Sequence, residues 1–143
     1  MADDTLAVIN LLGEISARAQ LRLAAMGEGL VPALVPFQGK LLALIGRKPG
    51  WSQQQLAAAV QRDKAQVART VKELEALGLV AREAAAGDWR SRSLRLTEAG
   101  AALFAELQAR RAALGAEMLG GLSAEQRVVL GEMLVSVRDR LKE

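Results

Sequence analysis

Apolar residues recur every three or four positions through most of the chain, which is the spacing of amphipathic helices. The first such stretch covers residues 5–26. Two more follow Thr97 and Ser123, whose hydroxyls suit the start of a helix, and Gly120-Gly121 separates them. The pattern therefore predicts long amphipathic helices at both ends of the chain.

Three shorter helices are predicted in the middle. Pro36 suits the first turn of a helix, and Gly46 is expected to end that helix. Residues 52–55 and 63–66 each have the spacing of a capping box, and Gly78 is expected to end the third helix in the left-handed conformation. The second and third helices lie only a few residues apart, as in a helix-turn-helix. The third is predicted to turn four side chains inward: Val67, Val71, Leu74 and Leu77.

Residues 79–82 and 93–96 alternate with the period of a β-strand, and residues 84–92 are expected to form the hairpin tip between them. The predicted fold is mainly α with a small β-hairpin wing, in a single domain spanning 1–143. A winged helix-turn-helix covers about 36–100. A dimerisation lobe is built from the terminal helices, at about 4–30 and 101–143.

Composition narrows the possible functions. The chain has no Cys, no His and no Tyr. This excludes disulfides and thiolate or histidine metal sites, and it removes the commonest general base. We therefore expect no metal, no cofactor and no enzymatic activity.

The amino terminus, Met-Ala-Asp-Asp, lacks the positive charge that opens a signal peptide. No apolar stretch approaches the ~20 residues that a membrane span needs. We expect a cytoplasmic protein with no membrane partner.

The net charge of +3 is concentrated in one segment. Residues 61–95 hold eight basic and five acidic side chains, and the rest of the chain holds eleven of each. The whole positive excess therefore lies on the third helix and the hairpin, where a phosphate backbone would need it.

The third helix is the candidate recognition helix for a DNA major groove. We expect Gln66 to read adenine and Arg69 to read guanine through paired hydrogen bonds. Phosphate contacts are expected from Lys64, Thr70 and Lys72. An ordinary solvated helix face would explain the same residues without DNA. The exposed positions are expected to be Lys64, Ala65, Gln66, Ala68, Arg69, Thr70 and Lys72.

Two further sets of residues could touch the DNA backbone or the minor groove. Ser52 and Gln53 begin the second helix, whose free N–H groups suit a phosphate. Arg90 and Arg92 on the hairpin suit a narrow minor groove. Asp88 cannot favour DNA directly, so its expected role is structural, through an ion pair to Arg90 or a turn hydrogen bond.

The most specific motif is Asp88-x-Arg90, followed after five residues by Leu96-Thr97-x-x-Gly100. With the order of elements, this motif resembles the MarR family of bacterial winged-helix regulators. The resemblance implies a homodimer that binds pseudo-palindromic DNA, with repression as the favoured mode of action. It also implies release of the DNA by a small molecule in many members.

The terminal helices carry more apolar surface than one small winged helix can cover, which indicates an obligate homodimer interface. The resemblance to the MarR family implies a site for an effector of unknown identity where the two lobes meet, although a regulator without any ligand fits equally well. The alternative function is a winged helix that binds protein and not DNA. Candidate pocket residues are Asn10, Glu14, Arg18, Gln38 and Arg47.

Overall fold

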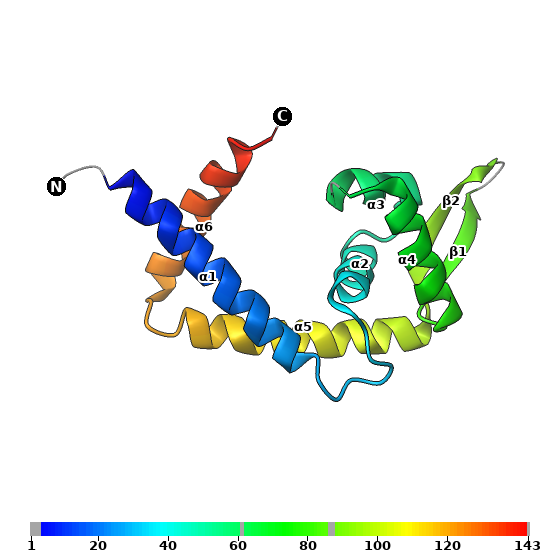
Figure 1. Ribbon diagram of the computed structural model, residues 1–143, viewed down its shortest axis with the longest axis horizontal. Coiled ribbons are helices and arrows are strands. Elements are labelled where there is room, and N and C mark those ends of the chain that lie inside the picture. Colours follow the sequence, from blue (N-terminus) through cyan, green and yellow to red (C-terminus); the bar gives the residue numbers. More distant parts are fainter. Residues whose placement is uncertain (1–3, 61, 86–87, 143) are drawn as a thin grey trace.

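The computed structural model describes residues 4–60, 62–85 and 88–142, with side chains given except at 84, 85 and 88–92. The predicted order of elements is confirmed (Figure 1). The elements are α1 (Thr5–Met26), α2 (Pro36–Arg47), α3 (Gln53–Val60), α4 (Lys64–Ala76), β1 (Val80–Ala85), β2 (Asp88–Leu96), α5 (Glu98–Met118) and α6 (Ala124–Asp139).

Helix α5 runs along the base of the molecule and connects two groups of elements (Figure 1). Helices α2, α3 and α4 and the β-hairpin gather near the start of α5, whereas α1 and α6 lie towards its end. The predicted fold class, a winged helix-turn-helix joined to a helical lobe, is confirmed.

The helix starts follow the capping residues in the sequence. Ser52 and Ser123 each form a complete capping box: each backbone N–H donates to a glutamine side chain three residues on, at 2.8 Å in both cases. Each hydroxyl accepts from the backbone N–H of that glutamine. Asp63 caps α4 by accepting from the N–H of Ala65 at 3.1 Å. These bonds satisfy N–H groups that have no partner inside the helix.

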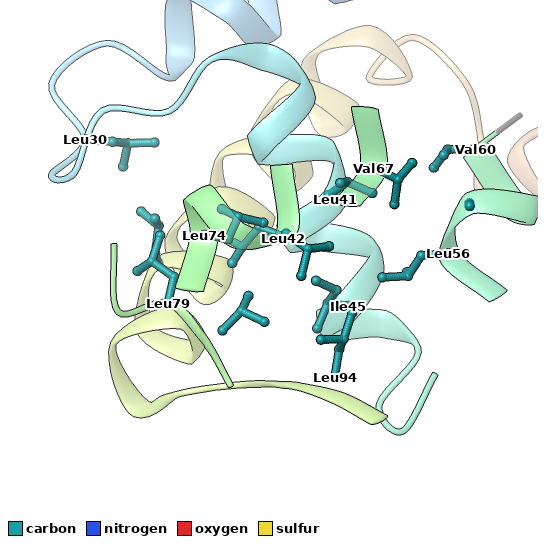
Figure 2. Close-up of a cluster of buried hydrophobic side chains, with 14 residues drawn as sticks. Leu30, Leu41, Leu42, Ile45, Leu56, Val60, Val67, Leu74, Leu79 and Leu94 are labelled. Carbon is teal, nitrogen blue, oxygen red and sulfur yellow. The ribbon is translucent and has the colours of Figure 1, made fainter. Parts of the chain in front are cut away.

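Helix α2 supplies the centre of the core, because Leu41, Leu42 and Ile45 are almost completely buried. The inward face of α4 packs against α2, as Figure 2 shows for Val67 and Leu74. Leu77 was predicted to point inward, and this is wrong: its side chain is 42% exposed. It lies one residue beyond the last residue of α4, and the chain leaves the helical path at the next residue, Gly78.

The hairpin is longer than the alternating pattern predicts. Strand pairing runs from Val80 opposite Leu96 to Ala85 opposite Asp88, with an irregularity between Glu83 and Ala85. The prediction that residues 84–92 form the tip is therefore too wide. Backbone pairing needs no apolar alternation, so it continues beyond the half-buried part of each strand.

The start of α3 is attached to the hairpin. The N–H of Leu94 donates to the carbonyl of Trp51 at 2.9 Å, and Ser52 forms an isolated bridge with Ser93. The base of the wing and the helix-turn-helix therefore form one unit.

A compact junction joins the end of α4, the hairpin and the start of α5. The Thr97 hydroxyl donates to the carbonyl of Gly78 at 2.6 Å and accepts from the N–H of Gly100 at 3.0 Å. Gly78 has a φ of +75°, as predicted for the residue that ends the helix. Gly100 lies against the backbone of Leu79, so a Cβ there would overlap the Leu79 carbonyl oxygen. This packing explains why threonine and glycine stand three residues apart in the motif.

The terminal helices have few contacts within the chain. Neither α1 nor α6 has a buried residue. Arg22 of α1 forms an ion pair of 2.5 Å with Glu117 of α5. The hydrogen bond to Glu117 raises the pKa of the Arg22 guanidinium. Arg110 of α5 also donates to the carbonyls of Met26 and Glu28.

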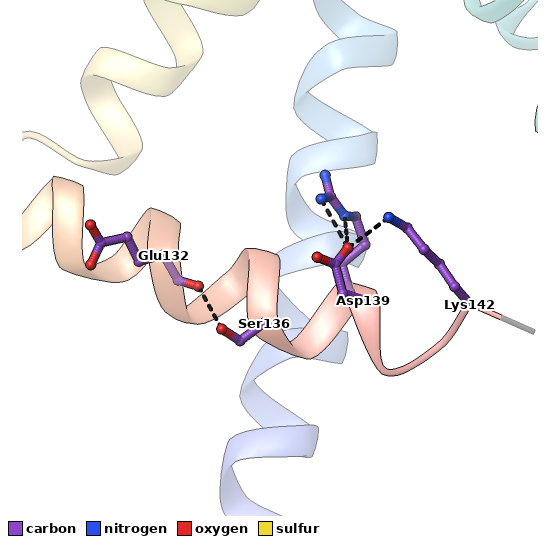
Figure 3. Close-up of polar contacts among 5 residues, drawn as sticks. Glu132, Ser136, Asp139 and Lys142 are labelled. Atoms are coloured by element: carbon purple, nitrogen blue, oxygen red, sulfur yellow. Dashed lines mark hydrogen bonds and ion pairs between the residues drawn. The ribbon is translucent and has the colours of Figure 1, made fainter.

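Polar contacts lie along the second half of α6 and just beyond its end (Figure 3). The Asp139 carboxylate accepts from Lys142 at 2.9 Å and from Arg138 at 3.0 Å. These hydrogen bonds lower the pKa of the Asp139 carboxyl, and the one from Lys142 has the larger effect. The Ser136 hydroxyl donates to the backbone carbonyl of Glu132 at 3.1 Å. These contacts join residues that are close in sequence and bring no other element onto α6. The helix has no buried residue, and its large apolar side chains remain exposed.

Candidate nucleic-acid interface

The candidate recognition helix α4 presents a basic outer face. Lys64, Arg69 and Lys72 are exposed, as is Ala65, while Gln66 and Ala68 are half-buried. Within the described residues, none of the three basic side chains forms an ion pair. Their charges are therefore available to an anionic partner.

Thr70 was predicted to be an exposed phosphate contact, and its predicted exposure is wrong. Its side chain is 5% exposed. Thr70 lies three residues after Val67 and four before Leu74, which places it on the buried stripe of α4. It belongs to the face that packs on the protein.

Ser52 and Gln53 lie at the start of α3, next to the hairpin. The Ser52 hydroxyl is held by the capping box, as described above. The Gln53 side-chain carbonyl accepts a hydrogen bond of 2.8 Å from Arg82 of β1. The start of α3 is thus fixed both by its own cap and by the wing.

Arg82 was not predicted to be a functional residue. Besides Gln53, its guanidinium binds the carboxylate of Glu75 on α4, with 2.7 Å between Nε and Oε1. The Arg82 and Glu75 side chains are 27% and 33% exposed. Gln53 and Glu75 are 29 and 7 residues away from Arg82 in sequence, and no periodic pattern relates the three positions.

The wing residues Asp88, Arg90 and Arg92 lie in β2, but their side chains are outside the part that the structure describes. The same holds for the predicted contact between Asp88 and Arg90. Nearer the base of the wing, Arg95 forms an ion pair of 2.6 Å with Glu83 of β1.

A cleft of about 840 Å³ lies where the end of α1, α2 and α5 meet. Its walls include apolar side chains such as Leu23, Phe37 and Leu107. The charged side chains that line it are all basic: Lys40, Arg47, Arg62, Arg110 and Arg111. The cleft could hold a molecule with an apolar body and a negative charge.

Of the five pocket residues proposed from sequence, only Arg47 lines this cleft. Arg18 faces Glu14 at 3.9 Å on the exposed side of α1. Gln38 accepts from the N–H of Val35 and donates to Glu73 of α4. The other basic residues of the cleft are Lys40 of α2, Arg110 and Arg111 of α5, and Arg62 just before α4. No sequence pattern relates these three segments, so their convergence could not be predicted.

Within the described residues, no helix has the length and hydropathy to cross a membrane. The same residues contain no cluster of acidic side chains that could hold a metal ion.

Residues 35–91, from the start of α2 to the hairpin, match the sequence model of the MarR family. Over these residues the chain is similar to the MarR family. The match covers α2, α3, α4 and β1 and reaches into β2. The resemblance inferred from the Asp88 and Gly100 motif is thereby confirmed.

Solved structures of the same fold extend the likeness over the full length of the chain. A MarR family protein from Bacillus stearothermophilus is 24% identical with a TM-score of 0.83, over 100% of this chain and 99% of the other. FabT from Streptococcus pneumoniae, solved in complex with DNA, is 19% identical with a TM-score of 0.81, over 96% and 97%. PcaV from Streptomyces coelicolor, solved with its natural ligand, is 24% identical with a TM-score of 0.74, over 99% and 100%. At these identities the likeness establishes a shared fold, including the terminal helices.

Proposed function

We propose that the protein is a sequence-specific DNA-binding transcriptional regulator that acts as a homodimer on pseudo-palindromic operators, most simply as a repressor. The observation that carries this proposal is the exposed basic face of α4 beside the hairpin of a winged helix that matches the MarR family. The DNA complex of FabT, which has the same fold, supports it.

Each part of the winged helix has a distinct task in the proposed complex. The start of α4 enters the major groove, with Gln66 and Arg69 at the base edges and Ala65 and Ala68 close to them. Lys64 and Lys72 contact phosphates, as do Ser52 and Gln53 at the start of α3. Arg90 and Arg92 of the wing enter the minor groove, with Asp88 supporting the wing. Thr70 is left out of the interface because it is buried.

Replacing Arg69 with alanine is expected to weaken operator binding by ~1–3 kcal/mol and to relax discrimination at one base pair. Arg69 carries the paired N–H donors that match guanine, and its side chain is exposed near the middle of α4. Competition titrations with single-base operator variants measure the effect. Arg127→Ala, which removes the same charge from α6, is the control. An equal loss on operator and random DNA would contradict base reading by Arg69.

Dimerisation sets the distance between the two recognition helices. A two-fold axis through the terminal helices would place the two recognition helices about one DNA turn, ~34 Å, apart. The exposed apolar side chains of α1 and α6 support this arrangement, because a stable monomer rarely leaves so much apolar surface uncovered.

The cleft between the lobes is the proposed effector site, and its basic lining favours a small organic anion. The bound ligand in PcaV supports an effector in this fold. Binding in the cleft would contact α1, α2 and α5 together and so change how the DNA-binding lobe is held.

Small organic carboxylic acids are tested beside the neutral amide of each acid. We expect only the acids to raise the melting temperature of the protein and to weaken its binding to operator DNA. Lys40→Ala should remove the response, because Lys40 is an exposed cation of the cleft on α2. Its operator affinity without ligand should stay within twofold of the wild type. Equal responses to acids and amides would contradict the assigned charge, and no response to any compound would favour a regulator without a ligand.

We also propose that the protein acts in the cytoplasm and has no catalytic role. A sequence without His, Cys or Tyr offers few groups for acid–base or nucleophilic chemistry. The alternative function, a protein-binding winged helix, gives no reason for the three exposed basic side chains that α4 presents together.

A further inference from the structure

Arg82 connects three elements of the DNA-binding lobe through one planar group. Its Nε donates to Glu75 of α4, and its Nη2 donates to Gln53 of α3, while its backbone belongs to β1. The guanidinium is rigid, so the direction of one bond fixes the direction of the other. Glu75 therefore determines the orientation in which Arg82 meets Gln53.

The contact with Arg82 also determines the orientation of the Gln53 amide. A guanidinium has only donors, so the Gln53 atom that faces it must be the carbonyl oxygen. The amide nitrogen is bonded to the same terminal carbon and therefore points away from Arg82. Gln53 is the first residue of α3, the end from which the helix N–H groups project. Its two remaining N–H donors are thus held beside a natural phosphate position.

We propose that Arg82 is a positioning residue for operator binding, which holds the Gln53 side chain so that its amide N–H groups donate to a DNA phosphate. The inference rests on the proposed DNA-binding function. Without Arg82, the Gln53 side chain would rotate freely and would lose entropy when it binds the phosphate. Arg82 thus acts through Gln53, and its own charge is matched by Glu75.

A double-mutant cycle tests this inference. Wild type, Arg82→Ala, Gln53→Ala and the double variant are titrated with operator DNA at several salt concentrations. Each single variant is expected to bind about tenfold more weakly, the loss of one charge-assisted hydrogen bond. The double variant should bind no more weakly than the weaker single variant, because both substitutions remove the same contact.

The salt dependence separates positioning from direct contact. If Arg82 itself neutralised a phosphate, its removal would reduce the slope of log affinity against log salt by ~0.9. The positioning role predicts an unchanged slope. It also predicts that Arg82→Ala changes affinity less than twofold in the Gln53→Ala background, whereas a merely structural role would weaken binding in both backgrounds.

Melting curves for all four proteins verify folding. If Arg82→Ala does not fold, Arg82→Lys replaces it in the cycle, since a single ammonium keeps the charge but cannot hold both partners in one plane. Additive losses, or a reduced salt slope, overturn the inference. If the wild type does not distinguish operator from random DNA, the proposed function fails instead, which separates the two failures.

Discussion

Replacing Gly100 with alanine is expected to destabilise the protein by about 3 kcal/mol or more. The added Cβ would overlap the carbonyl oxygen of Leu79 and would lie 2.9 Å from the carbonyl carbon. Both atoms belong to the backbone, so no side-chain rotation can relieve the overlap. The same Leu79 carbonyl accepts the N–H of Thr97 at 3.0 Å, so moving it would also disturb the start of α5.

Gly115 is a matched control on the same helix. A Cβ at this position would meet nothing within 4 Å. Gly115→Ala should therefore be neutral or should stabilise α5 by up to ~1 kcal/mol, because alanine has the higher helix propensity. Urea denaturation of the two variants measures both effects. Equal stability of Gly100→Ala and Gly115→Ala would contradict the close packing at the motif glycine.

Replacing Met133 with aspartate is expected to convert the dimer into monomers and to lower operator affinity at least ~100-fold. Met133 belongs to the apolar stripe of α6, where Met133, Leu134 and Val137 are 43–54% exposed in the single chain. A carboxylate buried between two copies of this face would lose its hydration without gaining a partner. A monomer would then contact only one half-site, and the loss of the second would produce the fall in affinity.

Analytical ultracentrifugation and operator titration together measure this effect. Glu132→Gln changes the charge of α6 by one unit in the opposite direction, off the stripe, and should leave both the dimer and the affinity unchanged. A Met133→Asp variant that remains dimeric at micromolar concentration would contradict the assignment of this face to the dimer interface.

Local signals in the sequence predicted much of the fold. Ser52, Asp63, Thr97 and Ser123 cap helices as expected, because a cap depends on residues only two or three positions apart. Gly78 ends α4 for the same kind of local reason. The hairpin was also predicted, although only its half-buried part alternates clearly enough to give its length.

The errors arise where burial depends on tertiary packing. Thr70 is polar and lies among charged residues, yet the path of α4 places it on the buried stripe with Val67 and Leu74. Leu77 is apolar, yet the end of the helix leaves it exposed. In both cases the residue type predicted one degree of burial, and the position of the residue on the helix produced the opposite one.

Parts of the candidate site could not be predicted because they join distant segments. The contact between Arg82 and Gln53 spans 29 positions and depends on how β1 lies beside α3. The basic residues of the cleft come from α2, from α5 and from the turn before α4. A single sequence has no period that relates such positions, whereas the recognition helix is continuous and could be identified from its own charges.

The measurement that tests the central claim most directly is a titration of the protein with DNA from upstream of its own gene, beside random DNA, at several salt concentrations. We predict that one site of two half-sites about one helical turn apart is bound at least ~10³-fold more tightly than random DNA. We also predict that affinity falls steeply with salt. Absence of binding at low salt would contradict the account and would favour the protein-binding alternative.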